Sequence, residues 1–195
     1  MTVWLMRHPR VQLPRPLCYG RSDVPLDEAH VRQCVEALAQ SLPPHTRIVT
    51  SERERTRCVA RQLGALRPDL RDWQVDANLN EMDFGQWEMV AWADIPQAAI
   101  DAWVADFAQH RFGGVESVQD VLERARQVLQ GHRQKMLGAA ENTLWITHAG
   151  MIRALQFWQQ HPKGRIQSAQ DWPQTVPEFG AVQVYASDFL YQAAR

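Results

Sequence analysis

Apolar residues gather in two short runs along the chain, and a histidine follows each run. Residues 2–6 precede Arg7 and His8, and residues 142–147 precede His148. Short apolar runs of this kind predict buried strands, here with the histidines at their carboxyl ends. Shorter or weaker patterns predict three further strands, over residues 47–50, 73–76 and 181–186.

Apolar residues recur at helical spacing between these strands. The spacing predicts four helices, over residues 27–42, 51–66, 117–137 and 149–158. Ser51 is the expected N-cap of the second helix, and a further helix is expected around residues 95–107. That helix lies in a segment of about residues 89–114 that looks like an insertion. Strands alternating with helices predict a single domain over residues 1–195, a three-layer α/β/α sandwich with a mostly parallel central sheet and a small helical cap insertion.

The phase of the helix over residues 51–66 selects one of its four arginines. Val59, Leu63 and Leu66 form the expected core stripe, and Arg55 precedes Val59 by four residues, so it shares that inner face. The other three arginines lie on a separate stripe, rotated by about 200°. We expect these three to face water: Arg53, Arg57 and Arg61.

Charge and cysteine content narrow the classes of function. The formal net charge is -1, without a block of one sign, so nothing favours nucleic acid or an anionic membrane as a partner. Three widely spaced cysteines argue against a disulfide framework or a structural zinc site. No apolar run approaches the roughly 20 residues of a membrane span, and no secretory leader precedes the first strand. We therefore expect a cytoplasmic protein.

Cationic side chains follow three of the expected strands. Arg7 and His8 follow the first, Arg55 lies shortly after the second, and His148 follows the fourth. Because ligands of open α/β sheets bind at the carboxyl ends of the strands, these residues are expected to converge. Two arginines offer forked donors to phosphoryl oxygens, and a protonated histidine adds a third charge. A second histidine, if held neutral, is a nucleophile that accepts a phosphoryl group.

An acid is also needed to protonate the leaving oxygen. Glu81 is the best candidate, because the neighbouring apolar residues Met82 and Phe84 can desolvate it. Asp83 and Glu88 are alternatives, although carboxylates in turns are more often structural.

Five motifs occur in a characteristic order. They are Arg7-His8, Thr50-Ser51 ahead of Arg55, Leu79-x-Glu81-x-x-Phe84-Gly85-x-Trp87-Glu88, Gly114-x-Glu116-Ser117 and Thr147-His148-Ala149-Gly150. Together they resemble the histidine phosphatase superfamily, which contains cofactor-dependent phosphoglycerate mutases and many phosphomonoesterases. Within it, residues 18–26 are most similar to the α-ribazole phosphatase-like branch.

The resemblance implies a role for each matching residue. His8 becomes the phosphohistidine, Glu81 donates the proton, and the phosphate is held by Arg7, Arg55, His148 and the backbone amide of Ala149. It implies neither a metal nor another cofactor. Tyr19 and Arg21 are expected at the mouth of the site, where they touch the substrate.

The expected function is that of a metal-independent phosphomonoesterase. Its expected partner is a small-molecule phosphate ester, for which α-ribazole 5'-phosphate is the suggested metabolite. A homodimer is also possible. One alternative is mutase-type phosphoryl transfer, against which Pro14 counts, because the mutases carry asparagine there. The other is a catalytically silent phospho-ligand module, in which Pro9, standing in place of the family's glycine, misplaces His8. Glu52-Arg53 also replaces the family's Pro-Leu.

Aromatic residues concentrate in one third of the chain and allow two interpretations. They either form a stacking wall for a base-like leaving group or pack within the cap. The i, i+4 spacing of Trp103 and Phe107 favours packing. The full set is Phe84, Trp87, Trp92, Trp103, Phe107 and Phe112.

Overall fold

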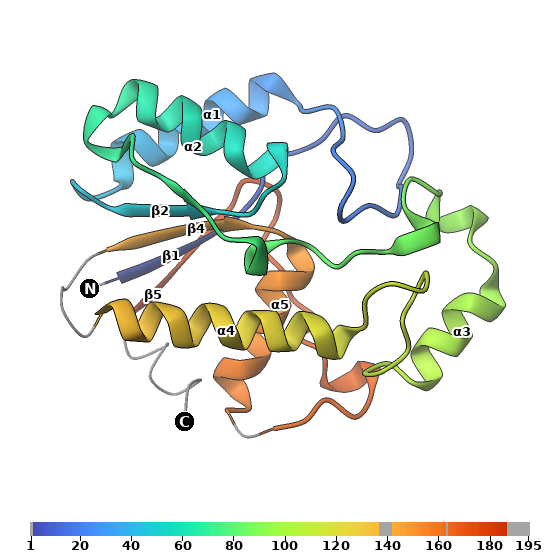
Figure 1. Ribbon diagram of the computed structural model, residues 1–195. Coiled ribbons are helices and arrows are strands. Elements are labelled where there is room, and N and C mark those ends of the chain that lie inside the picture. Colours follow the sequence, from blue (N-terminus) through green and yellow to red (C-terminus); the bar gives the residue numbers. More distant parts are fainter. Residues whose placement is uncertain (1, 137–141, 163, 187–195) are drawn as a thin grey trace.

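A five-stranded sheet forms the middle layer of the protein, in a computed structural model that describes residues 2–136, 142–162 and 164–186 (Figure 1). Its strands follow the order β3-β2-β4-β1-β5, and only β5 is antiparallel to its neighbour. The bounds are β1 Thr2–Arg7, β2 Arg47–Thr50, β3 Gln74–Val75, β4 Thr143–Thr147 and β5 Val182–Ala186. The expected mostly parallel α/β sandwich is confirmed.

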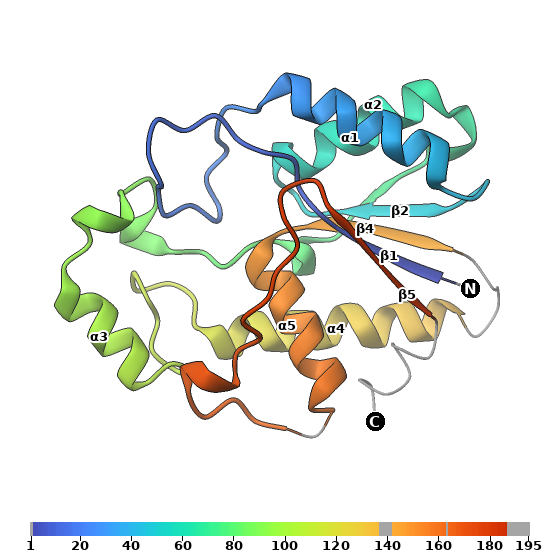
Figure 2. The same ribbon diagram turned by 180° about the vertical axis from the view of Figure 1, so that it is seen from behind.

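Two pairs of helices cover the two faces of the sheet (Figure 2). Helices α1 (Glu28–Ser41) and α2 (Glu54–Leu66) lie on one face, and α4 (Val118–Met136) and α5 (Ala149–Gln160) lie on the other. Strand side chains alternate between the two cores, as the pleat requires. Met6, Ile48, Leu144 and Ile146 pack toward α1 and α2, whereas Val3, Leu5, Val49 and Trp145 pack toward α4 and α5.

The segment expected as an insertion lies beyond the carboxyl ends of the parallel strands (Figure 1). It contains helix α3 (Gln97–Ala105), and a backbone hydrogen bond from Cys18 to Val90, 2.8 Å long, joins it to the loop after β1. Its role as a cap over the site stays a prediction. Short 3₁₀ turns complete the chain at Pro68–Leu70, Ala77–Leu79, Gly85–Trp87, Trp92–Asp94 and Ala169–Asp171.

The predicted ends of α2 need two corrections. The helix begins at Glu54 with Arg53 as its N-cap, because the hydroxyl of Ser51 is drawn instead toward His148. Leu66 does not belong to the core stripe. It is 57% exposed, while Leu70 in the following turn is buried.

Two features are absent from the described residues, a membrane-spanning helix and a metal-binding cluster. No helix in the described ranges has both the length and the apolar character needed to cross a membrane. Among the same residues, no group of three or more histidine, cysteine, aspartate or glutamate side chains is placed to hold a metal ion.

Candidate active site

The pairing of β1 with β4 brings the two strand-end histidines together. Arg7 pairs with Thr147 in parallel register, so His8 and His148 leave the sheet side by side. The backbone N–H of His8 donates to the carbonyl of Thr147 over 2.9 Å, and the centroids of the two rings are 5.2 Å apart. Both rings are almost completely buried. The convergence expected from the apolar runs is therefore present.

Arg55 joins these histidines from the first turn of α2. It is 1% exposed, in agreement with its inward helical phase. Its Nε donates to Nδ1 of His148 over 3.1 Å, and its two terminal nitrogens donate to the carbonyls of Ser22 and Gly20 over 2.8 and 2.5 Å. The arginine thus ties helix α2 to the end of β4 and to the loop after β1.

Arg53 corrects the expectation that the other arginines of α2 face water. Its side chain is 23% exposed, and its Nη1 donates to the carbonyl of Arg21 over 2.7 Å. The reason is that the loop after β1 folds over the start of the helix, which covers the first of the three positions. Arg61, two turns further on, is exposed as expected.

The hydrogen bond of His8 defines its tautomer. Nδ1 lies 2.8 Å from the carbonyl oxygen of Pro9, and because a carbonyl only accepts, Nδ1 must carry the proton. Burial lowers the pKa of His8 well below its usual value, and the nearby cations Arg55 and Arg7 lower it further. A neutral ring protonated at Nδ1 keeps an unshared electron pair on Nε2. His8 therefore has the form that a nucleophile requires.

His148 is neutral as well, which changes the expected charge of the site. Its Nδ1 accepts from Arg55, so Nε2 carries the proton and donates to Oγ of Ser51 over 2.8 Å. Burial lowers the pKa of His148 well below its usual value, and the charge of Arg55 acts in the same direction. The surroundings of His148 thus disfavour its protonated form, which was expected to supply a third positive charge. Its predicted phosphate contact requires exchanging one of these two partners.

Arg7 and His8 both lie against the ring of Phe179, whose centroid is 5.3 Å from that of the His8 ring. Nη1 of Arg7 donates to the carbonyl of Pro177 over 3.1 Å, and its guanidinium carbon is 3.7 Å from the ring centroid of Phe179. Its Nε is buried without a hydrogen-bond partner among the described residues. Burial lowers the pKa of Arg7. Sequence reasoning missed Pro177 and Phe179, because the segment before β5 shows neither helical nor strand periodicity.

Glu81 reaches the same region from the chain between β3 and α3. One carboxylate oxygen accepts from the backbone N–H of Gly150 over 2.9 Å, and the other accepts from Met82 over 3.0 Å. A Cβ atom at position 150 would lie 2.2 Å from Oε1 of Glu81. The glycine in the fifth motif therefore makes room for the acid at the N-terminus of α5, where a helix favours negative charge.

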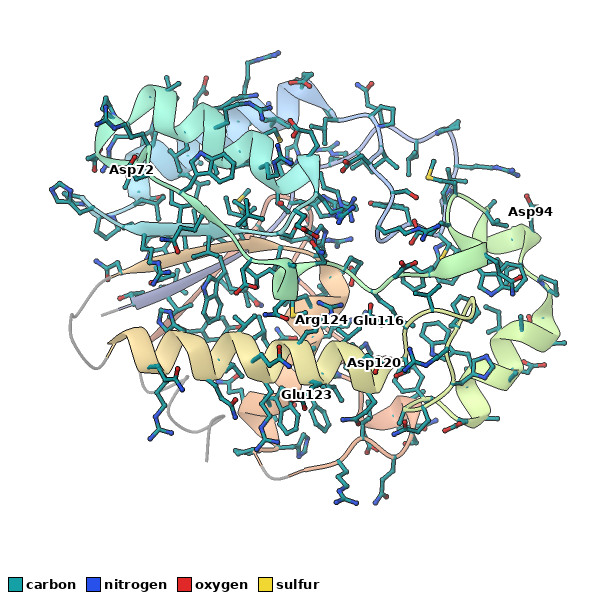
Figure 3. All side chains as sticks on the ribbon, viewed as in Figure 1. Asp72, Asp94, Glu116, Asp120, Glu123 and Arg124 are labelled. Carbon is teal, nitrogen blue, oxygen red and sulfur yellow. The ribbon has the colours of Figure 1, made fainter. Side chains whose placement is uncertain are left out.

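A side chain from α4 holds the backbone that carries this acid. Nη1 of Arg124 donates to the carbonyls of Asn78 and Asn80 over 2.8 and 2.9 Å. Its Nε donates to Glu116 over 2.8 Å, and Figure 3 shows the two side chains together beside the first turns of α4. The arginine and its carboxylate partner thus fix the segment on which Glu81 sits.

The two alternative acids have structural partners. Glu88 accepts hydrogen bonds from four backbone N–H groups, those of Gly20, Arg21, Ser22 and Phe84. Burial raises its pKa, but the hydrogen bonds from Ser22 and the backbone outweigh burial, so the pKa of Glu88 lies below its usual value. Asp83 accepts from the N–H of Gly85 over 2.8 Å. Both carboxylates shape the loops, as turn carboxylates commonly do.

The three residues expected to touch the substrate differ in position. The Tyr19 ring centroid lies 6.4 Å from that of His8 and 5.1 Å from the guanidinium carbon of Arg55. Arg21 is exposed and forms an ion pair with Asp83 at 3.5 Å. Ala149 is the first residue of α5, so its N–H has no acceptor within the helix. Tyr19 and Ala149 thus border the site, and Arg21 lines a cavity together with Glu81 and Arg53. Contact of Arg21 with the substrate stays a prediction.

The chain matches one family model and resembles several solved structures. The model is that of the histidine phosphatase superfamily (branch 1), and it matches residues 3–188. No curated protein has a matching sequence. An α-ribazole phosphatase from Shigella flexneri is 23% identical over 94% of this chain and 89% of that one, with a TM-score of 0.75, which establishes the fold.

Two other structures have somewhat higher identity. A putative α-ribazole-5'-P phosphatase from Escherichia coli K-12 is 26% identical over 78% of this chain and 76% of that one, with a TM-score of 0.65. A mycobacterial glucosyl-3-phosphoglycerate phosphatase is 25% identical over 97% and 93% of the two chains, with a TM-score of 0.75.

Proposed function

This chain belongs to the histidine phosphatase superfamily, and from that membership we propose that it hydrolyses phosphate monoesters through a phosphohistidine. The observation that carries the proposal is the state of His8, a neutral ring protonated at Nδ1 with Nε2 unprotonated. A positioned histidine in this state attacks phosphorus directly. The flanking guanidinium groups of Arg7 and Arg55 supply positive charge for the phosphoryl oxygens.

The first half-reaction transfers the phosphoryl group. Nε2 of His8 forms a bond to phosphorus as the bond to the ester oxygen breaks, and protonated Glu81 gives its proton to the leaving oxygen. In the second half-reaction, Glu81 takes a proton from water, whose oxygen attacks phosphorus and releases His8 and inorganic phosphate. The site thus returns to its starting state, with Glu81 acting first as acid and then as base. These steps use only side chains of this chain and require no metal.

The substrate within this class is proposed to be a small phosphorylated metabolite. Residues 18–26 resemble the α-ribazole phosphatase-like branch, and two similar structures carry that description, so α-ribazole 5'-phosphate is the first compound to assay. Pro14 supports hydrolysis over mutase chemistry, because the mutases use asparagine there. Release of inorganic phosphate, measured against formation of a phosphate isomer, distinguishes the two reactions.

The test of the central claim is a pair of histidine variants. His8→Ala is expected to lose hydrolysis of an aryl phosphate by at least about 10³-fold and to remain folded. The matched control His161→Ala changes an exposed histidine after α5 and should keep full activity. Rapid mixing with a radiolabelled phosphate ester should give an acid-labile phosphoprotein only when His8 is present. Undiminished turnover in His8→Ala would remove the proposal, and ligand affinity without labelling would favour the silent binding module.

A further inference from the structure

An apolar cavity lies beside the acid of the proposed reaction. It measures about 300 Å³, and Glu81, Ala149 and Gly150 line the side toward the histidines. Aromatic rings from residues 89–114 and from neighbouring segments also line it. These are Phe84, Trp92, Trp103, Phe107 and Trp172.

The aromatic wall is held in place by its own ring stacking. Trp103 stacks on Phe112 with ring centroids 4.4 Å apart, and Trp92 stacks on the same phenylalanine at 6.1 Å with the rings nearly parallel. Trp103 also stacks on Phe107 at 5.5 Å. Cap packing and a stacking wall are therefore compatible, because rings that pack against one another also face the cavity.

Two of the lining residues each have a buried N–H donor that is not satisfied within the described part of the chain. Nε1 of Trp103 and Nε of Arg153 are buried and have no hydrogen-bond partner within the described ranges. Leaving a buried N–H donor unpaired is unfavourable, so a ligand with an acceptor atom gains by meeting one. Glu81 and Ala149, which border the site of the phosphate, also line this cavity, so the cavity adjoins that site.

We propose that this cavity binds the alcohol portion of the phosphate ester, and that this portion is a flat aromatic or heteroaromatic group carrying a hydrogen-bond acceptor. The inference rests on the proposed hydrolysis, because it places the leaving oxygen next to Glu81. An apolar cavity of about 150 Å³ already admits benzene, so a cavity of twice that volume admits two fused rings. Stacking on tryptophan favours such a group over an aliphatic one.

The first test compares two phosphate esters on the unmodified protein. 2-Naphthylmethyl phosphate and ethyl phosphate both release a primary alcohol, so their intrinsic reactivities are similar and the difference reports binding. We expect kcat/KM to be at least about tenfold higher for the naphthylmethyl ester, because one buried aromatic group contributes that much. If both esters are hydrolysed with equal kcat/KM, the cavity assignment is overturned and the proposed hydrolysis stands. Absence of phosphate release from both esters instead contradicts the proposed hydrolysis.

The second test changes the wall and includes a measurement that needs no variant. Trp103→Leu is expected to lower the ratio of the two kcat/KM values by about tenfold. Val104→Ala, at a 50% exposed position of the same helix, should leave that ratio unchanged. On the unmodified protein, 2-naphthylmethanol should inhibit ethyl phosphate hydrolysis competitively, and at far lower concentration than ethanol. An unchanged ratio of the two kcat/KM values in Trp103→Leu overturns the assignment. Absence of inhibition by the aromatic alcohol overturns it as well.

Discussion

Arg55 and His148 hold each other in one orientation through the 3.1 Å hydrogen bond from Nε of the arginine to Nδ1 of the histidine. Within the described chain, three of the five N–H groups of Arg55 are engaged by protein acceptors, which leaves two for a ligand. The histidine is thereby fixed as a donor to Ser51. A buried arginine thus serves both as a structural tie and as a source of positive charge.

Replacing Gly150 by alanine should displace the acid. The added Cβ would lie 2.2 Å from Oε1 of Glu81, so the carboxylate must move. We expect kcat to fall at least about tenfold in Gly150→Ala, since general acid catalysis is sensitive to position. Gly131→Ala is the matched control within α4, where a Cβ meets nothing within 4 Å, and it should stabilise the helix by about 0.5–1 kcal/mol. Steady-state kinetics and thermal unfolding of both variants check the prediction, and normal kcat in Gly150→Ala contradicts it.

Removing Arg124 should loosen the segment that carries Glu81. Arg124→Ala loses the bonds to three backbone carbonyls, one of them that of Glu81, and removes the ion-pair partner of Glu116, so we expect kcat to fall more than KM rises. The free energy of unfolding should fall by about 1–3 kcal/mol. Arg61→Ala breaks an exposed ion pair and should change stability by less than about 1 kcal/mol, without affecting kcat.

Arg124→Lys separates a positioning role from simple destabilisation. Lysine keeps the charge but lacks the forked geometry that reaches three carbonyls and a carboxylate, so it should restore stability better than kcat. Urea unfolding and steady-state kinetics on the folded fraction measure the two effects. A loss of activity that matches only the unfolded fraction would mean that Arg124 is purely structural.

The two neutral histidines predict how stability depends on pH. Burial first, and then Arg55, hold the pKa of His8 and of His148 well below the usual 6.5. As the pH falls through about 6.5, both rings take up protons in the unfolded chain but not in the folded state. The free energy of unfolding should therefore fall, by at most about 1.4 kcal/mol per pH unit for each ring. Urea unfolding between about pH 7.5 and pH 5 measures this slope.

Single histidine variants identify the source of that slope. His8→Asn and His148→Asn should each reduce it, whereas His161→Ala, at an exposed position, should not. The acid limb of kcat/KM should also lie below pH 6.5, because the nucleophile stays neutral as the pH falls. A slope unaffected by either asparagine variant contradicts the assignment.

Restoring glycine at position 9 should have little effect on catalysis. The contact of Pro9 with His8 uses the carbonyl oxygen, which glycine also has, so kcat/KM in Pro9→Gly should stay within about threefold. Stability should fall by about 0.4–1 kcal/mol, since glycine gives the unfolded chain more freedom. Hydrolysis of an aryl phosphate measures the effect. A gain above tenfold would show that the proline misplaces the nucleophile.

The periodicity of the sequence predicted the strands and helices that carry the candidate site. Contacts between segments distant in the chain could not be predicted in this way. The inward phase of Arg55 follows from a repeat of about 3.6 residues, and the histidines follow from apolar runs, so local pattern suffices for both. The contacts of Arg7 with Phe179 and of Arg124 with Asn80 join segments far apart in the chain. No local pattern encodes such approaches. The hydrogen bond between Ser51 and His148 also joins distant segments, so the sequence pattern could not show that α2 begins at Glu54 and not directly after Ser51.

The register of β1 against β4 has a consequence for when the protein becomes active during its synthesis. A slip of two residues would separate His8 from His148 by roughly 6.6 Å, so only one alignment of these strands gives the pair. The two strands come from opposite parts of the chain, and pairings so distant form late in folding. A nascent chain therefore lacks activity until β4 has emerged, because β4 joins β2 to β1 and completes the core beneath α1 and α2. During refolding, hydrolysis should therefore recover after the helix content does, and the delay measures how late β1 pairs with β4.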